Sequence, residues 1–422
     1  MVKFLKSRFD LISLGLLALL GPLFVFPRVK WNWVLLAGVA AVFIGRSIFE
    51  RRLLPHTPVD LAVTLLVIWA FFGMLLNFNA IAVGMSKIAG LAYGITFFYI
   101  LIGGIRKLIR IKIAIVIFIT MGMVVSLIGT LSRLDHFEGL SIPQIDNNEL
   151  VKKIPKVIIK FDRAETGINP NPVGGTLLLF IPLGMMAFAS LLKEKIATAK
   201  QYPRYMAIVG MTMILGLEIF AIIYSRSSGA WLAFGFILLM MGKKRRLIKA
   251  CLGIGAIVTL FIIMKSPDLN NNAFIKNTRE SLNFSASSRI SLWKGGLEAA
   301  RANPVFGLGM DRLRATPPFE GISAHNQFIH LAAEMGIPAL IAYLAILIGA
   351  GWMTLEVARS RMSVGMILIM RGLAWGQVGF VIYGIADTIP LGAKPGLFFW
   401  ISLGLMTSVY LFGRENQLIG SK

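Results

Sequence analysis

Cysteine and histidine are scarce in this chain of 422 residues, which has one cysteine and four histidines. The lone Cys251 excludes an intrachain disulfide and any metal site built from cysteines. A glycine-rich phosphate-binding loop is also missing. Gly307-Leu308-Gly309 follows Asn303-Pro304 and has neither a third glycine nor a strand–helix context, so it predicts a turn and not a dinucleotide site.

Charged residues are few for a chain of this length: they make up 15% of it, against 56% hydrophobic residues and a mean hydropathy of +0.75. A soluble domain of this size would need far more charge, so the composition predicts a polytopic membrane protein. Basic residues outnumber acidic ones, and the net charge is +23. The basic runs, such as Arg51-Arg52 and Arg106-Lys107, lie in short gaps between apolar segments. They therefore indicate membrane topology and headgroup contacts, and not binding of nucleic acid.

Long apolar runs account for most of the sequence. A helix that crosses a bilayer needs roughly 17–25 mostly apolar residues. We predict an all-α protein with about twelve spans that form a single integral membrane domain over residues 1–422. The first run resembles a signal peptide but has no small-residue cleavage site, so we expect it to be retained as a span. The predicted spans are residues 10–27, 31–46, 58–78, 80–105, 111–131, 170–192, 205–224, 227–242, 248–265, 326–352, 363–387 and 394–413.

The distribution of basic residues predicts how these spans are oriented. With the N-terminus in the cytoplasm, the cytoplasmic segments hold about 23 basic residues and the short loops opposite hold about four. Since short cytoplasmic loops are enriched in lysine and arginine, both termini are expected to be cytoplasmic. The two long loops, 132–169 and 266–325, then lie on the outer side together with Arg226. The polar chemistry would face away from cytoplasmic nucleotides.

The first long loop, 132–169, is rich in lysine near its middle, which favours contact with anionic headgroups, although a solvated basic loop is an equally good interpretation. The loop ends with Arg163 and then two Asn-Pro steps, at Asn169-Pro170 and Asn171-Pro172. Such steps interrupt regular structure before the next span. Gly174-Gly175 follows at once, and glycines here would let another backbone or a ligand approach closely.

The second long loop, 266–325, predicts an amphipathic helix near 288–302 that is capped by a serine, ends at Asn303-Pro304 and lies on the membrane with Trp293 at the interface. Arg289 would fall in the first turn of this helix, where free backbone N–H groups and a guanidinium bind anions. Arg226 lies in the tight turn between two predicted spans. For both arginines the alternative is a headgroup anchor.

His325 immediately precedes the predicted span 326–352, at the end of the second long loop. A neutral histidine beside a bound anion is suited to act as a general base. The alternative is a simple helix cap. Asp387, at the outer end of the span 363–387, is a candidate partner for His325 or for an arginine, or else an ordinary interfacial acid.

Several charged residues fall inside predicted spans, where they are costly and usually functional. Lys87 and Glu218 could border one pocket or pair with each other. Arg371 lies deeper, and the sequence assigns it no role. His330 and Glu334 are four residues apart on one helix, so we interpret them as a structural pair. No third ligand is evident beside them, and no metal site is expected.

These motifs, taken in order, resemble the O-antigen ligase and polymerase superfamily, and the ligase most closely. The resemblance covers residues 163–340 in motifs and the whole chain in topology. The segments that carry it are Asn169-Pro170-Asn171, Ser225-Arg226-Ser227-Ser228-Gly229-Ala230-Trp231, Arg289-x-x-x-Trp293, Asn303-Pro304-Val305-Phe306-Gly307-Leu308-Gly309, Ala324-His325-Asn326-Gln327 and Glu334-Met335-Gly336-Ile337-Pro338.

The resemblance implies a GT-C-like, inverting glycosyltransferase of the bacterial inner membrane that needs no metal or other cofactor and works at the periplasmic face. Its donor would be a glycan on undecaprenyl diphosphate. Carried over by motif, Arg226 and Arg289 would bind the diphosphate, and His325 would activate the acceptor hydroxyl. Asp387 is a weaker carry-over because little motif surrounds it. Further candidate site residues are Arg163, Asn171 and Lys87.

The acceptor separates the possible functions. In a ligase it is a sugar hydroxyl of lipid A-core; in an O-antigen or exopolysaccharide polymerase it is a second lipid-linked repeat unit. We favour the ligase because Ala324-His325-Asn326 resembles the ligase arrangement. A protein O-glycosylating relative is a further possibility, and a lipid-linked glycan transporter is the main alternative outside transferases. Transporters usually place polar residues near the bilayer midplane in repeated halves, a pattern that this sequence lacks.

Overall fold

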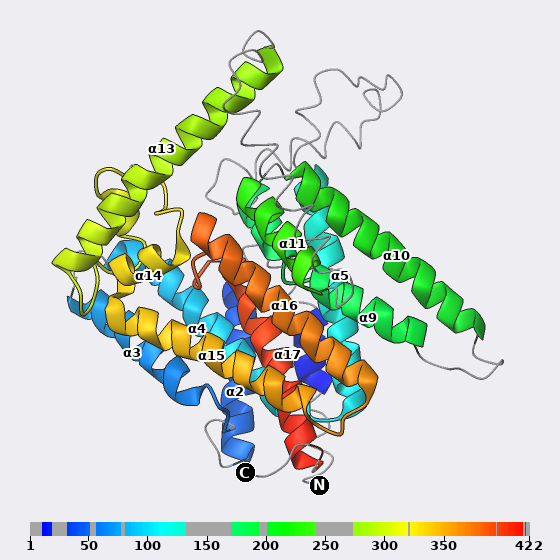
Figure 1. The fold of residues 1–422 in the computed structure, drawn as a ribbon. Helices are drawn as coiled ribbons and strands as arrows, with labels where there is room; N and C mark the ends of the chain where they lie inside the picture. The colour runs from blue at the N-terminus through cyan, green and yellow to red at the C-terminus, as the bar shows by residue number, and fades with distance from the viewer. Residues whose placement is uncertain are drawn as a thin grey trace, which may run out of the picture.

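The computed structural model describes residues 11–18, 32–50, 56–76, 81–131, 170–193, 201–225, 227–241, 273–319, 321–393, 395–416 and 418. Within these residues the regular structure is helical and no strand is present (Figure 1). The helices are α2 (Asn32–Glu50), α3 (Asp60–Leu76), α4 (Ile81–Gly104), α5 (Leu108–Leu131), α8 (Pro170–Leu177), α9 (Ile181–Lys193), α10 (Gln201–Tyr224), α11 (Ser228–Met241), α13 (Ala273–Ala302), the 3-10 helix η5 (Leu313–Ala315), α14 (Gln327–Met335), α15 (Ile337–Ala358), α16 (Val364–Ala386) and α17 (Gly396–Glu415).

Seven helical segments in the described part of the chain are long and apolar enough to cross a bilayer, which agrees with a membrane protein. They are Gly84–Gly104, Leu108–Thr130, Asn171–Lys193, Tyr202–Tyr224, Ile337–Ala358, Val364–Ala386 and Gly396–Glu415. The predicted spans 58–78 and 227–242 correspond to the shorter apolar helices α3 and α11, and 31–46 to α2. The predicted span 248–265 and most of 10–27 lie outside the described residues, as does the loop 132–169, so the total of twelve stays a prediction.

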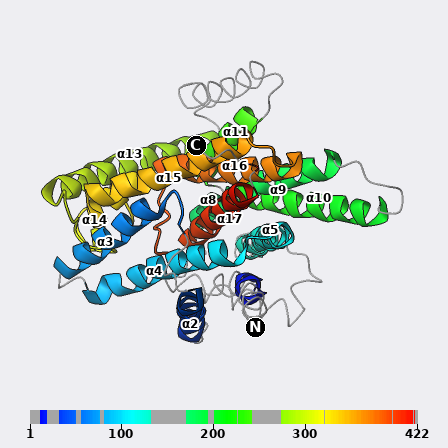
Figure 2. The same ribbon diagram turned by 90° about the horizontal axis from the view of Figure 1, so that it is seen from below.

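Helix α17 is the centre of the bundle, and 89% of its most apolar stretch is buried (Figures 1 and 2). It packs most closely on α4, where small residues let the helices approach. A side chain at Gly94 would overlap the ring of Trp400, and one at Gly404 would touch Leu101. Close helix packing through small residues is a principal source of helix association in membranes.

Helices α9 and α16 are packed in the same way. A Cβ atom added to Gly376 would lie 2.8 Å from the carbonyl oxygen of Leu179, and one added to Gly372 would lie 2.7 Å from Cα of Leu183. The segment Leu178–Phe180 between α8 and α9 is turn-like and fully buried. The middle of α16 is therefore packed against the segment that follows the Asn-Pro steps.

The predicted span 326–352 is wrong as one helix, because the chain breaks at Gly336 into α14 and α15. Gly336 has φ +86, and a Cβ atom there would collide with the carbonyl oxygen of Val305. A left-handed conformation in a crowded position favours glycine. Pro338 then stands in the first turn of α15, where its missing N–H costs nothing. The membrane-length helix begins at Ile337, and α14 lies before it.

The helix expected near 288–302 is longer than predicted. Helix α13 begins at Ala273 and ends at Ala302, immediately before Asn303-Pro304 as expected, and its first turns extend beyond the bundle in Figure 1. The residues of α13 before 288 contain neither proline nor glycine, so nothing in them stops the helix. Arg289 therefore lies in the interior of α13 and not in its first turn. The free N–H groups of a helix start are not available to it, which corrects the predicted anion site.

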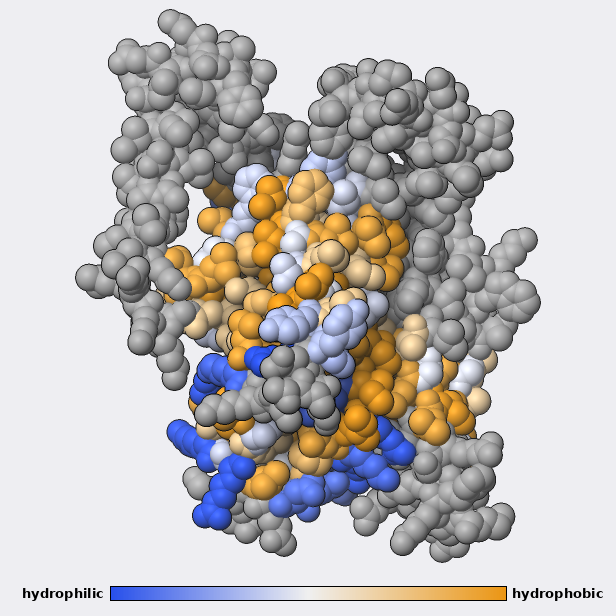
Figure 3. Space-filling model, turned by 90° about the vertical axis from the view of Figure 1, so that its right-hand side faces the viewer, coloured by the Kyte–Doolittle hydropathy of each residue, from blue (hydrophilic) through white to orange (hydrophobic). Residues whose placement is uncertain are grey.

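Polar and apolar surfaces are separated on the molecule. Figure 3 shows a broad apolar area over the helices, with hydrophilic residues gathered toward one end. Arg106, which follows α4, pairs with Glu415 at the end of α17 over 3.1 Å. Arg204 near the start of α10 donates hydrogen bonds to the carbonyl oxygens of Leu191 and Leu192. Basic residues thus hold together the helix ends that lie opposite Asp387.

The contact between α9 and α16 gives a test of this packing. Replacement of Gly376 by valine forces a branched side chain against the backbone at Leu179, which should destabilise the protein by about 1–3 kcal/mol. Gly216→Val is the matched control, because a Cβ atom added to this glycine of α10 would meet no neighbouring heavy atom within 4 Å. Thermal unfolding of the purified protein in detergent should give a lower midpoint for Gly376→Val alone. Equal midpoints for the two variants would refute the close approach of α9 and α16.

Candidate active site

His325 forms a short contact with Asp387 that joins the second long loop to the end of α16. The two atoms, Nδ1 of His325 and Oδ1 of Asp387, are 2.8 Å apart. The side chain of His325 is 25% exposed and that of Asp387 only 7%. The acid is therefore buried behind the histidine, and the imidazole reaches the surface.

The backbone of His325 is held in a left-handed conformation, with φ +46. Its N–H donates to Oγ of Ser323, and its carbonyl oxygen accepts a hydrogen bond of 3.2 Å from Nε1 of Trp293 in α13. Non-glycine residues adopt such a φ rarely, and usually where the surroundings impose it. The contacts on both sides fix the direction in which the imidazole points.

Asn326, and not His325, caps α14. Its Oδ1 accepts hydrogen bonds of 3.0 Å from the N–H groups of Phe328 and Ile329, and its Nδ2 donates to the carbonyl oxygen of Ile385. Asparagine is a preferred N-cap residue because its short side chain reaches these otherwise unpaired donors. The interpretation of His325 as a simple cap is therefore wrong, and its ring is available for other interactions.

Both carboxylate oxygens of Asp387 are occupied. Oδ1 accepts from the N–H of Thr388 at 2.7 Å as well as facing His325, and Oδ2 accepts from the hydroxyl of Tyr383 at 3.0 Å. A carboxylate anchored in this way favours Nδ1–H of the histidine as donor, which leaves Nε2 as an acceptor. Asp387 was expected as a partner for His325 or an arginine, and the structure pairs it with His325.

Tyr383 connects Asp387 to the segments that carry the two arginine motifs. Its hydroxyl lies within hydrogen-bonding reach of Ser227 and within electrostatic range of Arg289. Its ring packs so closely on Gly175 that a side chain there would overlap it. Sequence reasoning missed Tyr383, although its position four residues before Asp387 places the two on one face of a helix.

Arg289 is brought to this cluster by α13, and its side chain is partly buried. Trp293, one helical turn further along α13, makes the hydrogen bond to the backbone of His325. Helix α13 thus presents the guanidinium and fixes the histidine at the same time.

Arg226 and Arg163 lie outside the described residues. The neighbours of Arg226, Ser225 and Ser227, are described and buried. A Cβ atom at Gly174 would lie 2.8 Å from Oγ of Ser225, so the Asn-Pro segment packs on this turn. Asn171 lies in the first turn of the same short helix, α8, and is partly buried. The expected close approach at Gly174-Gly175 is present, and both glycines face protein.

Lys87 lies on α4 beside the loop that begins at Asp387. The backbone of Lys87 is so close to Gly392 that a side chain at Gly392 would overlap it. Its Nζ is 4.0 Å from Oδ1 of Asp311, so Lys87 pairs with this acid, and the alternative of a pairing with Glu218 is wrong. Glu218 is buried in α10, and its carboxylate has no hydrogen-bond partner among the residues that the structure describes.

His330 and Glu334 form the expected structural pair, with Nε2 and Oε2 3.2 Å apart and both side chains buried. Oε1 of Glu334 also accepts from the N–H of Leu313. Burial raises the pKa of Glu334, but the charge and hydrogen bond of His330 and two backbone N–H groups outweigh it, so the pKa is lowered. The pair ties the loop after α13 to α14. In the described part of the chain no three His, Cys, Asp or Glu residues are grouped to hold a metal ion.

The turn at Gly307-Leu308-Gly309 completes this connection. The N–H groups of Leu308 and Gly309 donate to the carbonyl oxygens of Ala333 and Glu334, at 2.8 and 2.9 Å. Both glycines have positive φ, which confirms the predicted turn. The segment Leu308–Leu313 of the loop between α13 and α14 is thus packed on α14.

Comparison with known families identifies the central part of the chain. A family model described as O-antigen ligase matches residues 211–344, a range that contains Arg226, Arg289 and His325 and ends before Asp387. A comparison with curated proteins gives no significant match. The family match agrees with the order of the motifs, and residues 211–344 of this chain are similar to the O-antigen ligase family.

Proposed function

We propose that this protein is an O-antigen ligase, which transfers a glycan from undecaprenyl diphosphate to a sugar hydroxyl of lipid A-core in lipopolysaccharide biosynthesis. The observation that carries the proposal is the pair of His325 and Asp387, 2.8 Å apart, with α13 bonded to His325 one helical turn beyond Arg289. The family match over residues 211–344 supports a ligase or polymerase of lipid-linked glycans.

His325 is the general base of this proposal. With Nδ1 directed at Asp387, Nε2 accepts the proton of the acceptor hydroxyl as the oxygen attacks the anomeric carbon. Asp387 stabilises the imidazolium that forms, and Tyr383 and Thr388 hold the carboxylate in place. A carboxylate behind a histidine has the same orienting role in other enzymes that use this pair.

The leaving group is an anionic diphosphate, and arginines are suited to bind it. Arg289 and Arg226 would neutralise the charge that develops as the sugar–phosphate bond breaks. Attack by the hydroxyl from the opposite face of the sugar inverts the anomeric centre. In this scheme the guanidinium groups meet the electrostatic demand of the leaving group, so the reaction is metal-independent. Arg163, Asn171 and Lys87 are proposed to border the bound substrates.

The proposed location is the bacterial inner membrane, with one integral domain over residues 1–422 and a GT-C-like arrangement. The active site would be periplasmic and both termini cytoplasmic. The supporting observation is the concentration of basic residues at the helix ends opposite Asp387, where Arg106 and Arg204 lie. A periplasmic site also meets the donor where lipid-linked glycans are presented.

An O-antigen or exopolysaccharide polymerase is the second candidate, because the same residues could activate a hydroxyl of a second lipid-linked repeat unit. The motif around His325, which resembles the ligase arrangement, favours the ligase. A lipid-linked glycan transporter has less support, since the polar cluster of described residues lies at one end of α16 and not at its middle.

Removal of the base tests the mechanism. His325→Ala should lower the rate of glycan transfer by about 10²–10⁴-fold, because general-base catalysis contributes about that much. Asp387→Asn should lower it by about ten- to a hundredfold, as the loss of one charge-assisted hydrogen bond predicts. The assay uses purified protein, undecaprenyl-diphosphate glycan and lipid A-core.

The matched control is His56→Ala, which removes an exposed histidine before α3 and should leave the rate unchanged. Full activity of His325→Ala would exclude the general-base role. A loss that His56→Ala shares would point to general damage to the protein and not to chemistry.

The arginine of α13 gives an independent test. Arg289→Gln should cost about ten- to a hundredfold in rate, because the hydrogen bond between a guanidinium and the departing diphosphate is lost. Arg301→Gln, on an exposed position of the same helix, should have little effect. Addition of EDTA should not alter the wild-type rate. Dependence on a divalent metal would contradict the role of the arginines at the leaving group.

The two candidate reactions differ in their products. With lipid A-core and donor together, a ligase forms glycosylated lipid A-core, which gel electrophoresis separates from donor. With donor alone, a polymerase lengthens the lipid-linked glycan by whole repeat units. Lengthening of the donor in the absence of lipid A-core, with no product when the core is added, would reject the ligase in favour of the polymerase.

A further inference from the structure

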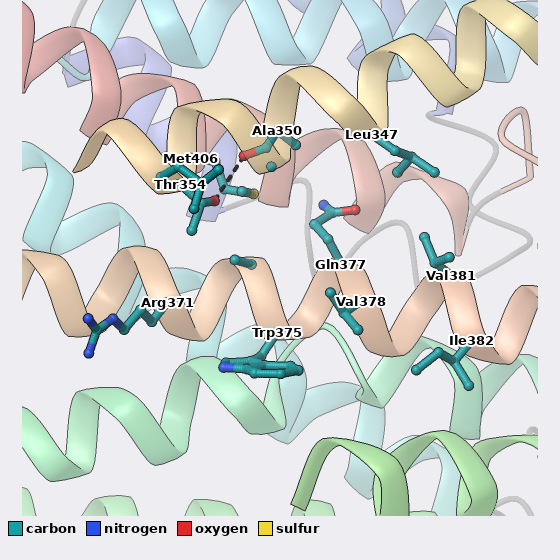
Figure 4. A pocket seen from close by; sticks show the side chains of 13 residues that line it. Leu347, Ala350, Thr354, Arg371, Trp375, Gln377, Val378, Val381, Ile382 and Met406 are labelled. Atoms are coloured by element: carbon teal, nitrogen blue, oxygen red, sulfur yellow. Dashed lines mark hydrogen bonds between the residues drawn. The ribbon is translucent and has the colours of Figure 1, made fainter. Parts of the chain in front are cut away.

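A groove of about 570 Å³ runs between α15 and α16, with α17 behind it (Figure 4). It lies away from the cluster around His325, and no residue of that cluster lines it. Most of its walls are apolar, and the side chain of Gln377 points between the helices (Figure 4). Its lining includes Leu355, Arg371, Trp375, Gln377, Val378 and Ile382.

The groove opens on the hydrocarbon side of the molecule. On α15 the exposed residues around it are Ile348, Trp352 and Leu355, and on α16 Val378 is exposed. Both helices are among the segments long and apolar enough to cross a bilayer. Large apolar side chains exposed on spanning helices face lipid, so the groove meets acyl chains and not water.

Arg371 is the one charged residue among those that line the groove. It precedes Asp387 by 16 residues, or about 24 Å of α16 at 1.5 Å per residue, so it lies toward the opposite leaflet. In Figure 4 its side chain extends away from Gln377, at one end of the row of lining residues. No acidic side chain in the described part of the chain forms an ion pair with it, and a guanidinium inside a bilayer is costly without a charged or polar partner.

We propose that this groove binds an anionic phospholipid of the leaflet opposite the active site. The lipid phosphate pairs with Arg371, and one acyl chain lies along the groove toward Ile382, a distance of 11 residues or about 16 Å of helix. The direction fits the bilayer, because a lipid of that leaflet has its headgroup nearer the end of α16 that carries Arg371 and its chains nearer the middle.

The same direction argues against the glycan donor as the occupant. In the proposed function the donor diphosphate lies beside Arg289 and His325, at the other end of α16. A lipid whose anionic group is at Arg371 is therefore a different molecule. The groove is a structural lipid site that would exist whether the enzyme is a ligase or a polymerase, and its test does not depend on glycan transfer.

Trp375 lines the groove and can report on its occupant. The full-length protein is reconstituted in vesicles of unlabelled phosphatidylcholine. One series contains an increasing fraction of brominated phosphatidylglycerol, and the other an increasing fraction of brominated phosphatidylcholine. Bromine quenches nearby tryptophans, and the difference between wild type and Trp375→Phe isolates Trp375. Half-maximal quenching should need about fivefold less brominated phosphatidylglycerol than brominated phosphatidylcholine, as expected for one arginine at an anionic lipid.

Two variants of Arg371 test whether its positive charge or the shape of its side chain causes the lipid preference. Arg371→Gln should abolish the preference for phosphatidylglycerol, and Arg371→Lys should keep it. Arg359→Gln, a change at an arginine that follows α15 and lies outside the groove, is the matched control and should behave as wild type. If Arg371→Gln cannot be purified, the ratio of the two lipids measured on the wild-type protein decides alone.

Equal quenching of wild-type Trp375 by the two brominated lipids would overturn the proposal, and so would an unchanged preference in Arg371→Gln. Added undecaprenyl diphosphate gives the last outcome. If it relieves quenching by brominated phosphatidylglycerol more effectively than an equal amount of unlabelled phosphatidylglycerol, the groove holds the donor chain and the proposed phospholipid site is wrong.

Discussion

The contact between Nδ1 of His325 and Oδ1 of Asp387 connects parts of the chain that are 62 residues apart. It joins the end of the loop after α13 to the end of α16, with α14 and α15 between them in sequence. The next two residues make hydrogen bonds to the same region. Nδ2 of Asn326 donates to the carbonyl oxygen of Ile385, and Oε1 of Gln327 accepts from the N–H of Ile389. Three neighbouring residues therefore hold the two segments together. The imidazole owes its position to this junction more than to any single helix.

Glycines let other segments of the chain approach the contact between His325 and Asp387 closely. Gly175 makes room for the ring of Tyr383, and Gly229 also lies against that ring. Gly392 allows α4 to meet the loop after Asp387. In a bilayer, where apolar side chains gain little by leaving lipid for protein, such close packing contributes much of the stability of helix contacts. The polar cluster is thus built on a framework of small residues.

Much of this could be predicted from the sequence, because membrane spans have a strong compositional signal. The end of α13 at Asn303-Pro304, the turn at Gly307 and the pairing of His330 with Glu334 follow from local rules about proline, glycine and helical spacing. The start of α13 could not be predicted, since serine-rich residues permit both a cap and a continuing helix. Arg289 was consequently expected in a first turn that lies elsewhere.

The partners of charged residues also could not be predicted from the local sequence. Lys87 pairs with Asp311 and not with Glu218 because of which helices pack side by side. The lengths of the spans alone do not determine that arrangement. Tyr383 was overlooked because a tyrosine in an apolar span has no distinctive composition. Hydropathy locates apolar helices along the chain, but which helices become neighbours depends on the shapes of their side chains.

The hydrogen bond from Trp293 to the backbone of His325 has a mechanical consequence. Trp293 and Arg289 are one turn apart on α13. The helix that carries the guanidinium therefore also holds the backbone of His325 in place. A tilt of α13 would move the guanidinium and break the bond to His325, whose neighbours Asn326 and Gln327 stay bonded to Ile385 and Ile389. In the proposed mechanism, this one helix would set the spacing between the general base and the arginine that binds the leaving group.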